Sequence, residues 1–249
     1  RRLRGLDDAR AAGAPTYRHR LPVGDHLMVA TADRLKKRAA EKAVELIRSG
    51  MIVGLGTGST AAHAVSAIAG KLQSGELNGI LGIPTSAQTE EQARRLEVPL
   101  TTLEEHPEVD ITIDGADQVD PAGNLIKGGG GALLREKIVA TASAKYAIVV
   151  DDSKLVKILG DGFPLPVEVV TFGWKTSFRT IRDLGAEPAL RLSNGDPFRT
   201  DEGHYIVDCT FDGGMSDPVA VDAMLRALPV VVETGLFLGM NPEVIVGRA

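Results

Sequence analysis

The stretch KGGGGALLREKI, positions 127–138, places a lysine and a glutamate on either side of four consecutive glycines. Glycine loses more conformational freedom on folding than any other residue, so such a run is expected where backbone turns tightly or approaches a ligand closely. If the glycines fold around a ligand, Lys127 and Glu136 face it from opposite sides. The alternatives are a flexible linker and, for Arg135 and Lys137, a solvated helix face.

A second cluster of carboxylates lies in the stretch TIDGAD, where an apolar run ends in a polar turn. A turn at Gly115 allows Asp114 and Asp117 to converge on one point. The alternative is a polar turn held by Asx hydrogen bonds, which is common. Paired acids also suggest a metal site, but His63 and His106 do not stand at ligand spacing from them, so we expect no metal.

The stretch GLGTGST, positions 54–60, follows a short apolar run and precedes a helical one. It fails as a dinucleotide fingerprint because Ser59 stands where the third glycine belongs, and it lacks the lysine of a phosphate-binding Walker loop. What remains is a glycine turn with hydroxyls at a helix N-terminus, where free N–H groups attract an anion such as phosphate. A turn in which Ser or Thr caps the helix is equally compatible with the residues.

These motifs sit on alternating helical and strand-like segments. A helical pattern runs from Leu35 to Ile47 with Asp33 available as its cap, and the apolar runs MIVGLG, ILGIPTS, VDITIDGAD and YAIVVDDS indicate buried strands. Helical stretches separate the strands, which predicts a parallel sheet covered by helices, with ligands beyond the carboxyl ends of the strands. GTGST, PTS, DGAD and DDSK all fall at such ends.

The pattern changes after Gly160. FPLPVEVVTFGW reads as a β-rich run, and RLSNGDPFRTDEGHYIVDCTF as a hairpin whose turn lies near Asn194-Gly195 or near 201–203. A smaller, more antiparallel unit is therefore expected at 160–231. VVVETGLFLGM returns to a buried-strand pattern that we expect to rejoin the first sheet, so the α/β domain takes 31–159 and 232–249.

Composition narrows the possible partners. The chain has 249 residues, 43% of them hydrophobic, a net charge of -5 and a single cysteine. There is no basic surplus for nucleic acid and no apolar run of the ~20 residues that a bilayer needs. We expect a cytoplasmic protein with a small-molecule partner. Residues 1–30 carry many arginines and no sustained periodicity, so we interpret them as an appended extension.

Seven motifs occur in the order seen in type A ribose-5-phosphate isomerases, which the chain resembles from about residue 31 to its end. They are LKK at 35–37, GTGST at 56–60, DGAD at 114–117, KGGGGALLREKI at 127–138, DDSK at 151–154, FPLPVEV at 163–169 and ETGLF at 233–237. The resemblance implies a Rossmann-like, mostly parallel α/β domain with a smaller α+β (ferredoxin-like) domain inserted near the C-terminus. It also implies a homodimer or homotetramer that interconverts D-ribose 5-phosphate and D-ribulose 5-phosphate without metal or cofactor.

The resemblance also assigns roles. Glu136 is the implied base, Lys127 stabilises the enediolate, Asp114 assists ring opening or proton shuttling, and Asp117 binds hydroxyls. The remaining substrate-binding residues implied are Lys36, Gly56, Thr57, Gly58, Ser59, Thr60, Ser86, Gly128, Gly129, Gly130 and Lys154. The glycine run then brings backbone donors against the sugar without side-chain obstruction.

One position departs from the family pattern. Many relatives read DGADE, and Gln118 stands here in place of the last Glu, which removes a charge and puts in doubt any role of this position in orienting Lys127. Two other functions stay open: a non-catalytic sugar-phosphate sensor, which would not need Asp114, Lys127 and Glu136 together, and a related-fold transferase or phosphosugar deaminase, for which we place no catalytic histidine.

Overall fold

Five parallel strands form the central sheet. The computed structural model describes residues 23–248, with side chains described from residue 33 onward. The strand order is β14-β6-β3-β1-β2, and neighbouring strands pair in parallel. Their bounds are Ile52–Leu55 (β1), Leu81–Pro84 (β2), Ile111–Asp114 (β3), Tyr146–Asp151 (β6) and Glu243–Gly247 (β14). The predicted α/β sheet is confirmed.

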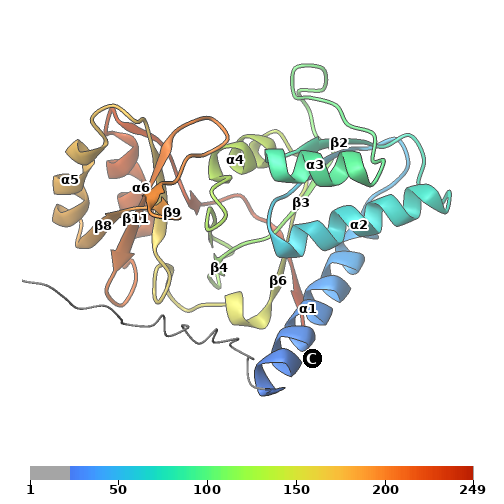
Figure 1. Cartoon of the computed structure of the whole chain (residues 1–249), viewed down its shortest axis with the longest axis horizontal. Helices are drawn as coiled ribbons and strands as arrows, with labels where there is room; N and C mark the ends of the chain where they lie inside the picture. The colour runs from blue at the N-terminus through green and yellow to red at the C-terminus, as the bar shows by residue number, and fades with distance from the viewer. Residues whose placement is uncertain (1–22, 249) are drawn as a thin grey trace, which may run out of the picture.

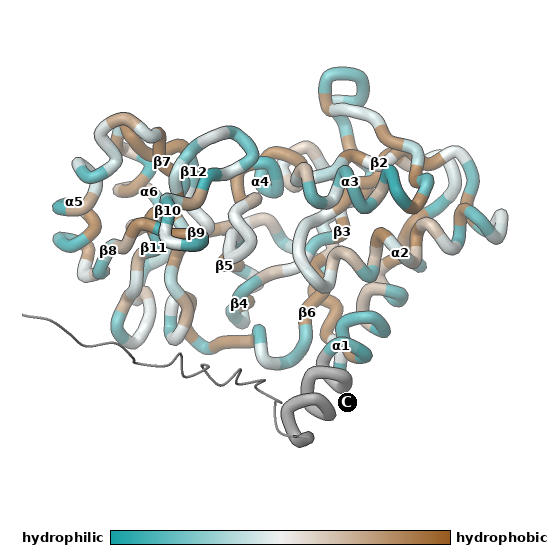
Figure 2. Tube along the Cα trace, viewed as in Figure 1, coloured by the Kyte–Doolittle hydropathy of each residue, from teal (hydrophilic) through white to brown (hydrophobic). Residues whose placement is uncertain are grey.

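Helices and a second small sheet cover the two faces of this sheet (Figure 1). The helices α1 (Val23–Val44), α2 (Ser59–Gln73) and α3 (Ala87–Arg95) share one apolar cluster with it. On the other side lie α4 (Leu133–Thr141) and a three-stranded antiparallel sheet of order β13-β5-β4. Its strands are Gln118–Val119 (β4), Leu125–Ile126 (β5) and Leu236–Phe237 (β13). Figure 2 shows the contrast between the hydrophobic trace of β6 and the many hydrophilic turns of α1 and α3.

Helix α1 starts earlier than its sequence pattern predicts. It begins at Val23, inside the stretch 1–30 that the sequence sets apart, and no Gly or Pro interrupts residues 25–49. Residues 1–22 lie outside the described part of the chain. Asp33 therefore sits within the helix and contacts Nε2 of His63 at 2.9 Å instead of acting as a cap. In the helix that the structure describes from 23 to 44, as in those that follow, no segment is long and apolar enough to cross a bilayer.

A four-stranded antiparallel sheet, of order β12-β7-β11-β8, forms the smaller α+β unit. Its strands are Leu165–Val169 (β7), Ala186–Leu190 (β8), Tyr205–Phe211 (β11) and Val231–Thr234 (β12). The helices α5 (Ser177–Asp183) and α6 (Pro218–Arg226) pack on one face of it around a separate apolar cluster, and η2 (Trp174–Thr176) precedes α5. The predicted α+β unit is confirmed, whereas its exact domain boundaries stay a prediction.

The path of the chain after this unit differs from the expectation for VVVETGLFLGM. Its first part, β12, pairs with β7 in the antiparallel sheet, and its second part, β13, pairs with β5. The strand that rejoins the parallel sheet is β14 beside β6, farther along the chain. A buried apolar run predicts a strand but not the strand with which it pairs, because either sheet would bury the same side chains.

Both turns suggested for the hairpin region occur. Asn194 and Gly195 have φ values of 53° and 89° and join the short strands β9 (Leu192–Ser193) and β10 (Asp196–Pro197). A positive φ at both central residues is the signature of the type I′ hairpin turn, for which Asn-Gly is favoured. The second reversal spans 200–203, where the N–H of Gly203 donates to the carbonyl of Thr200.

Lys137 joins helix α4 to β12 and β13, two consecutive strands that belong to different sheets. Its Nζ lies 2.8 Å from Oε1 of Glu233 and donates to the carbonyls of Thr234 and Leu236 at 2.7 Å each. Burial lowers the pKa of Lys137, and Glu233 opposes that shift. The solvated face considered for this residue is therefore wrong: the ammonium is enclosed and all three of its donors are used.

Replacing Lys137 with Met should lower the free energy of unfolding by about 3 kcal/mol, because two buried carbonyls lose their donor while Glu233 keeps Arg226. Urea unfolding followed by circular dichroism measures the change. Lys145→Met, at an exposed position, is the matched control and should stay within about 0.5 kcal/mol of the wild type. Equal effects of the two substitutions would contradict a joining role for Lys137.

Candidate active site

Two loops that leave the parallel sheet meet the glycine run and the start of α4 around a small cavity of about 100 Å³. One loop follows β1 and the other follows β3, at the carboxyl ends of adjacent strands, as expected for a ligand site in an open α/β sheet. The residues that line it are Thr57, Gly58, Ser59, Thr60, Gly115, Ala116, Asp117, Lys127, Gly128, Gly130 and Glu136.

Three charged side chains converge at the base of this cavity. Nζ of Lys127 lies 3.0 Å from Oδ2 of Asp114 and 3.2 Å from Oε1 of Glu136, and it also donates to the carbonyl of Gly115. The exposed fractions of the three side chains are 3%, 0% and 5%. The structure thus brings together the three residues expected to carry proton transfer, although Lys127 and Glu136 touch directly instead of facing a ligand from opposite sides.

Burial controls the protonation of this cluster. It raises the pKa of Glu136 to about 8, against the opposing attraction of Lys127 and with further support from the charge of Asp114. Burial also raises the pKa of Asp114, again opposed by Lys127. Desolvation alone would lower the pKa of Lys127, but the two carboxylates raise it well above its ordinary value. The lysine therefore stays charged while the carboxylates compete for one proton.

The hydrogen bonds decide which carboxylate takes that proton. Oδ1 of Asp114 accepts from the N–H groups of Thr57 and Gly115, at 3.1 and 2.7 Å, and such bonds favour the ionised form. One oxygen of each acid, Oδ2 of Asp114 and Oε2 of Glu136, is buried without a hydrogen-bond partner among the described residues, although Oδ2 of Asp114 lies 3.0 Å from Nζ of Lys127. Glu136 is consequently the group that titrates near neutral pH, with a free oxygen at a cavity wall. The hydroxyl of Tyr146, which sequence patterns did not single out, is likewise buried without a described partner.

The turn after β1 leaves the N-terminus of α2 uncapped. Its N-cap residue is Gly58, with φ 102° and no side-chain hydrogen bond, so the interpretation of this turn as a Ser or Thr cap is wrong. The first N–H groups of a helix have no intrahelical acceptor, and with the helix dipole they attract anions. Lys36 reaches the same point from α1, with Nζ 3.2 Å from Oγ of Ser59.

A buried hydroxyl network supports this turn from below. Oγ1 of Thr57 donates to Oγ of Ser86 at 2.8 Å and contacts Oγ1 of Thr85 and Thr89 at 2.8 and 3.2 Å. Ser86 caps α3 by accepting from the N–H of Thr89, and it does not line the cavity. Gly56 lies against Asp114, whose side chain and Cα a Cβ at position 56 would strike. These residues position the loop from behind.

The glycine run closes the opposite wall of the cavity. Gly128 has φ 101°, and a Cβ there would collide with Leu133, so both conformation and space require glycine. The N–H of Gly129 donates to Oδ2 of Asp117 at 2.8 Å. Asp117 thus fixes the loop as well as lining the cavity, while Gly128 and Gly130 present their backbone to it.

Lys154 and Gln118 both lie outside the lining of this cavity. Lys154 ends the short helix η1 (Asp152–Lys154) and is not among the residues that line the cavity. Gln118 does not contact Lys127: its Oε1 accepts from the N–H of Gly160 and its Nε2 donates to the carbonyl of Asp161, both at 2.7 Å. The side chain of Gln118 therefore does not orient Lys127 by direct contact, in agreement with the doubt raised by the sequence. Only an amide both donates and accepts here, so Gln suits the position better than an ionised Glu would.

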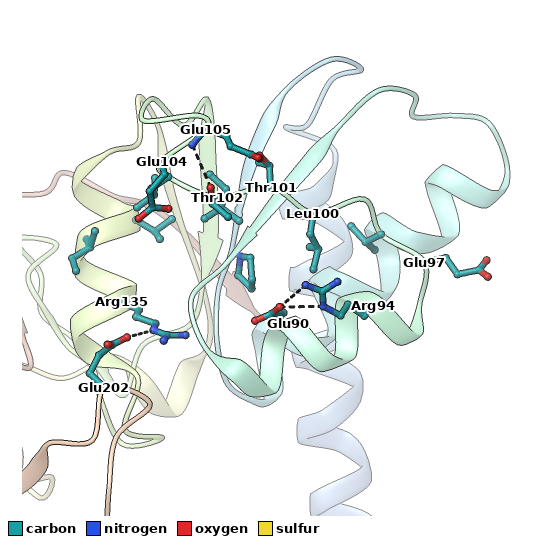
Figure 3. A pocket seen from close by; sticks show the side chains of 16 residues that line it. Glu90, Arg94, Glu97, Leu100, Thr101, Thr102, Glu104, Glu105, Arg135 and Glu202 are labelled. Carbon is teal, nitrogen blue, oxygen red and sulfur yellow. Dashed lines mark hydrogen bonds and ion pairs between the residues drawn. The ribbon is translucent and has the colours of Figure 1, made fainter.

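A larger cavity of about 840 Å³ lies between α3, the segment 97–105 and α4 (Figure 3). Both of its arginines are paired with glutamates of the same lining: Nη2 of Arg94 lies 2.6 Å from Oε1 of Glu90, and Nε of Arg135 lies 2.5 Å from Oε1 of Glu202. These pairs are partly exposed, and Lys127 is not among the lining residues. Size therefore does not identify the site here; the buried charges of the smaller cavity do.

Comparisons with known proteins show which family the chain resembles over most of its length. A family model described as "Ribose 5-phosphate isomerase A (phosphoriboisomerase A)" matches residues 81–249. The chain is 51% identical over 220 residues to a ribose-5-phosphate isomerase A of Synechococcus, covering 88% of this chain and 95% of that one. A solved ribose 5-phosphate isomerase from Plasmodium falciparum is similar with a TM-score of 0.83 and 41% identity, over 86% of this chain and 94% of its own.

Another similar structure is a D-ribose-5-phosphate isomerase in complex with phospho-erythronic acid. Its TM-score is 0.84 at 38% identity, and the match covers 87% of this chain and 95% of that one. Both solved structures extend over the parallel sheet and the smaller unit together, because each match covers most of both chains.

The carboxyl of Glu136 should titrate with a midpoint near 8, because burial outweighs the attraction of Lys127. Asp114→Asn should lower this midpoint by removing a neighbouring negative charge, and Asp117→Asn should lower it less because the Asp117 charge contributes less. Infrared titration of the Glu-labelled protein measures all three. A wild-type midpoint near the ordinary Glu value of about 4.3 would contradict this electrostatic account.

Proposed function

The chain belongs to the ribose 5-phosphate isomerase A family, and from this premise we propose how its residues carry out the reaction. The enzyme interconverts D-ribose 5-phosphate and D-ribulose 5-phosphate. The observation that carries the proposal is the buried contact of Lys127 with Glu136 and Asp114, beside the uncapped N-terminus of α2. A sensor or a deaminase is not favoured.

Glu136 is the proposed base. Isomerisation of the open-chain aldose removes the proton from C2, forms an enediolate and returns the proton to C1. The base must be ionised to begin and must bind a proton that it later releases, which a carboxylate with a pKa of about 8 does close to neutral pH. Its free Oε2 is the oxygen that takes the proton.

Lys127 is the proposed stabiliser of the enediolate oxygens. Its ammonium is held by Asp114, Glu136 and the carbonyl of Gly115, so it is oriented before the substrate arrives. When Glu136 takes the proton from carbon it loses its negative charge, and Lys127 becomes available to the developing oxyanion. Asp114 then shuttles the proton between the two substrate oxygens, and Asp117 binds a hydroxyl.

The uncapped start of α2 is the proposed phosphate site. The backbone N–H groups of residues 58–60 and the hydroxyls of Ser59 and Thr60 surround the expected phosphate position, while Thr57 contributes from the cavity wall with its hydroxyl bonded to Ser86 behind the loop, and Lys36 adds a charge from α1. A phosphate held here lies across the cavity from the glycine run, so the open-chain sugar extends toward Lys127 and Glu136. We also propose that the protein is a homodimer or homotetramer. We propose a cytoplasmic location because a single cysteine suits a reducing compartment.

Phospho-erythronic acid, which a similar isomerase binds, suits the same arrangement. Its carboxylate places two negative oxygens on one carbon, much as the enediolate spreads charge over two neighbouring oxygens. In this chain those oxygens would meet Lys127 while the phosphate meets α2. We therefore propose that the acid competes with ribose 5-phosphate in the cavity.

Glu136→Gln should lower kcat by at least ~10²-fold, because the amide keeps the shape of the side chain but cannot accept the proton. KM should change by less than about threefold, since the phosphate contacts remain. Conversion of ribose 5-phosphate to ribulose 5-phosphate, followed by absorbance in the presence of EDTA, measures both constants. Full activity of the variant would remove Glu136 from the role of base.

Lys36→Ala should raise KM by about tenfold with little change in kcat, because a charged contact to the phosphate is lost in the ground state and the transition state alike. Lys37→Ala is the matched control: that side chain is 62% exposed, faces Glu41 and should leave KM unchanged. Lys154→Ala tests the residue that the structure leaves outside the cavity lining. An unchanged KM in this variant would exclude Lys154 from the phosphate site.

A further inference from the structure

Arg191 reaches from the small antiparallel unit to the glycine run of the active site. Its Nε and Nη2 bind the two carboxylate oxygens of Asp208, a bidentate pair. Its Nη1 donates to the carbonyl of Gly128 at 2.7 Å and to that of Gly129 at 3.1 Å. The side chain is only 14% exposed. The guanidinium therefore connects the small unit to the backbone of the glycine run at the active site.

The backbone of Arg191 is itself fixed. Its N–H donates to the carbonyl of Ile206 at 2.8 Å, and its own carbonyl accepts from the N–H of Phe198 at 2.9 Å. The same Phe198 ring packs against Gly131, where a Cβ would strike it. Both the backbone and the side chain of Arg191 are thus held by hydrogen bonds, and the contact with the glycine run is not a chance contact of a surface side chain.

By holding the carbonyls of Gly128 and Gly129, Arg191 also fixes the directions of the N–H groups of Gly129 and Gly130. A trans peptide is planar, so the N–H of residue i+1 points away from the carbonyl of residue i. Holding the carbonyl of Gly128 directs the N–H of Gly129, which donates to Asp117 at 2.8 Å. Holding the carbonyl of Gly129 directs the N–H of Gly130 away from Arg191, and Gly130 lines the cavity.

These peptides need an external hold because glycine imposes little preference of its own. The Gly128 carbonyl also accepts from the N–H of Gly131 at 3.0 Å, so it keeps a partner without the arginine. The Gly129 carbonyl has Arg191 as its sole donor within residues 23–248, and the N–H of Gly130 has no acceptor there. The peptide between Gly129 and Gly130 consequently depends on Arg191 most.

We propose that Arg191, anchored by Asp208, is a positioning residue that fixes the Gly129–Gly130 peptide so that the Gly130 N–H faces the substrate. This inference rests on the proposed roles of the cavity residues, with the Gly130 N–H as a donor to the sugar oxygens near Lys127. The smaller unit then takes part in catalysis through one side chain, although it contributes none of the charged groups at the cavity base.

Steady-state kinetics of Arg191→Ala, Arg191→Lys and Arg199→Ala test the proposal. Arg199 is the matched control because it lies on the same hairpin, donates to the carbonyl of Gly203 and stacks over Tyr205 without touching the glycine run. Arg191→Ala should lower kcat by roughly 10- to 100-fold, since a misplaced donor costs transition-state stabilisation. KM should change by less than about threefold because the phosphate contacts persist.

Arg191→Lys should restore little, because one ammonium does not reproduce a planar fork bound to both a carboxylate and two carbonyls. Asp208→Asn keeps the arginine and loosens its anchor, so it should lower kcat by an intermediate factor; it also serves if Arg191→Ala fails to fold. A kcat for the Arg191 variants equal to that of Arg199→Ala would overturn the proposal.

Amide hydrogen exchange of the peptide containing residues 127–133 separates this inference from the proposed function. Arg191→Ala should speed exchange at Gly129 and Gly131, whose N–H groups donate to Asp117 and to the carbonyl of Gly128, by about tenfold relative to Arg199→Ala, whether or not either protein isomerises sugar. An inactive wild type with this difference would overturn the assignment of the cavity and leave the positioning role standing. An active wild type with identical exchange in the two variants would overturn the positioning role alone.

Discussion

A lysine buried among two carboxylates and a carbonyl is the constraint on which the active site depends. Enclosing an isolated ammonium is prohibitively costly, so Lys127 needs close partners: it donates hydrogen bonds to Glu136 and to the carbonyl of Gly115, and Asp114 supplies a second negative charge at 3.0 Å. The same burial makes ionisation of the carboxylates unfavourable and raises the pKa of both Asp114 and Glu136. The cluster therefore holds a proton close to neutral pH, and the interaction that allows burial is also the one that produces a usable base.

The surrounding structure exists to hold this cluster in place from several directions. β3 ends at Asp114, Lys127 directly follows β5, and the first turn of α4 carries Glu136. Gly56 allows the phosphate loop to lie against Asp114, and the hydroxyls of residues 85–89 brace that loop from behind. Because these elements come from distant parts of the sequence, the cluster is a product of the whole sheet and cannot form locally.

Sequence patterns predicted the parts of this arrangement that repeat or cluster. Apolar runs marked the parallel strands, and glycines beside charged residues marked the loops at their ends. Patterns did not reveal contacts between units, so Arg191 and Asp208 gave no signal, and the hydroxyl of Thr89 lay outside every motif. They also misplaced β12, because burial does not name a partner strand. The competition between burial and Lys127 for the pKa of Glu136 likewise required distances.

Adjacent residues on α4 divide its functional and structural tasks. Glu136 faces the cavity with one oxygen unpaired, which is unfavourable for stability, while Lys137 makes three buried bonds to Glu233, Thr234 and Leu236. Those three acceptors lie where the chain leaves the small unit, and the N–H of Lys127 donates to the carbonyl of Gly235 in the same segment. The helix turn that carries Glu136 and the backbone of Lys127 are therefore both hydrogen-bonded to the same segment, residues 233–236. A displacement of segment 233–236 would therefore move Glu136 and Lys127 together and preserve their contact.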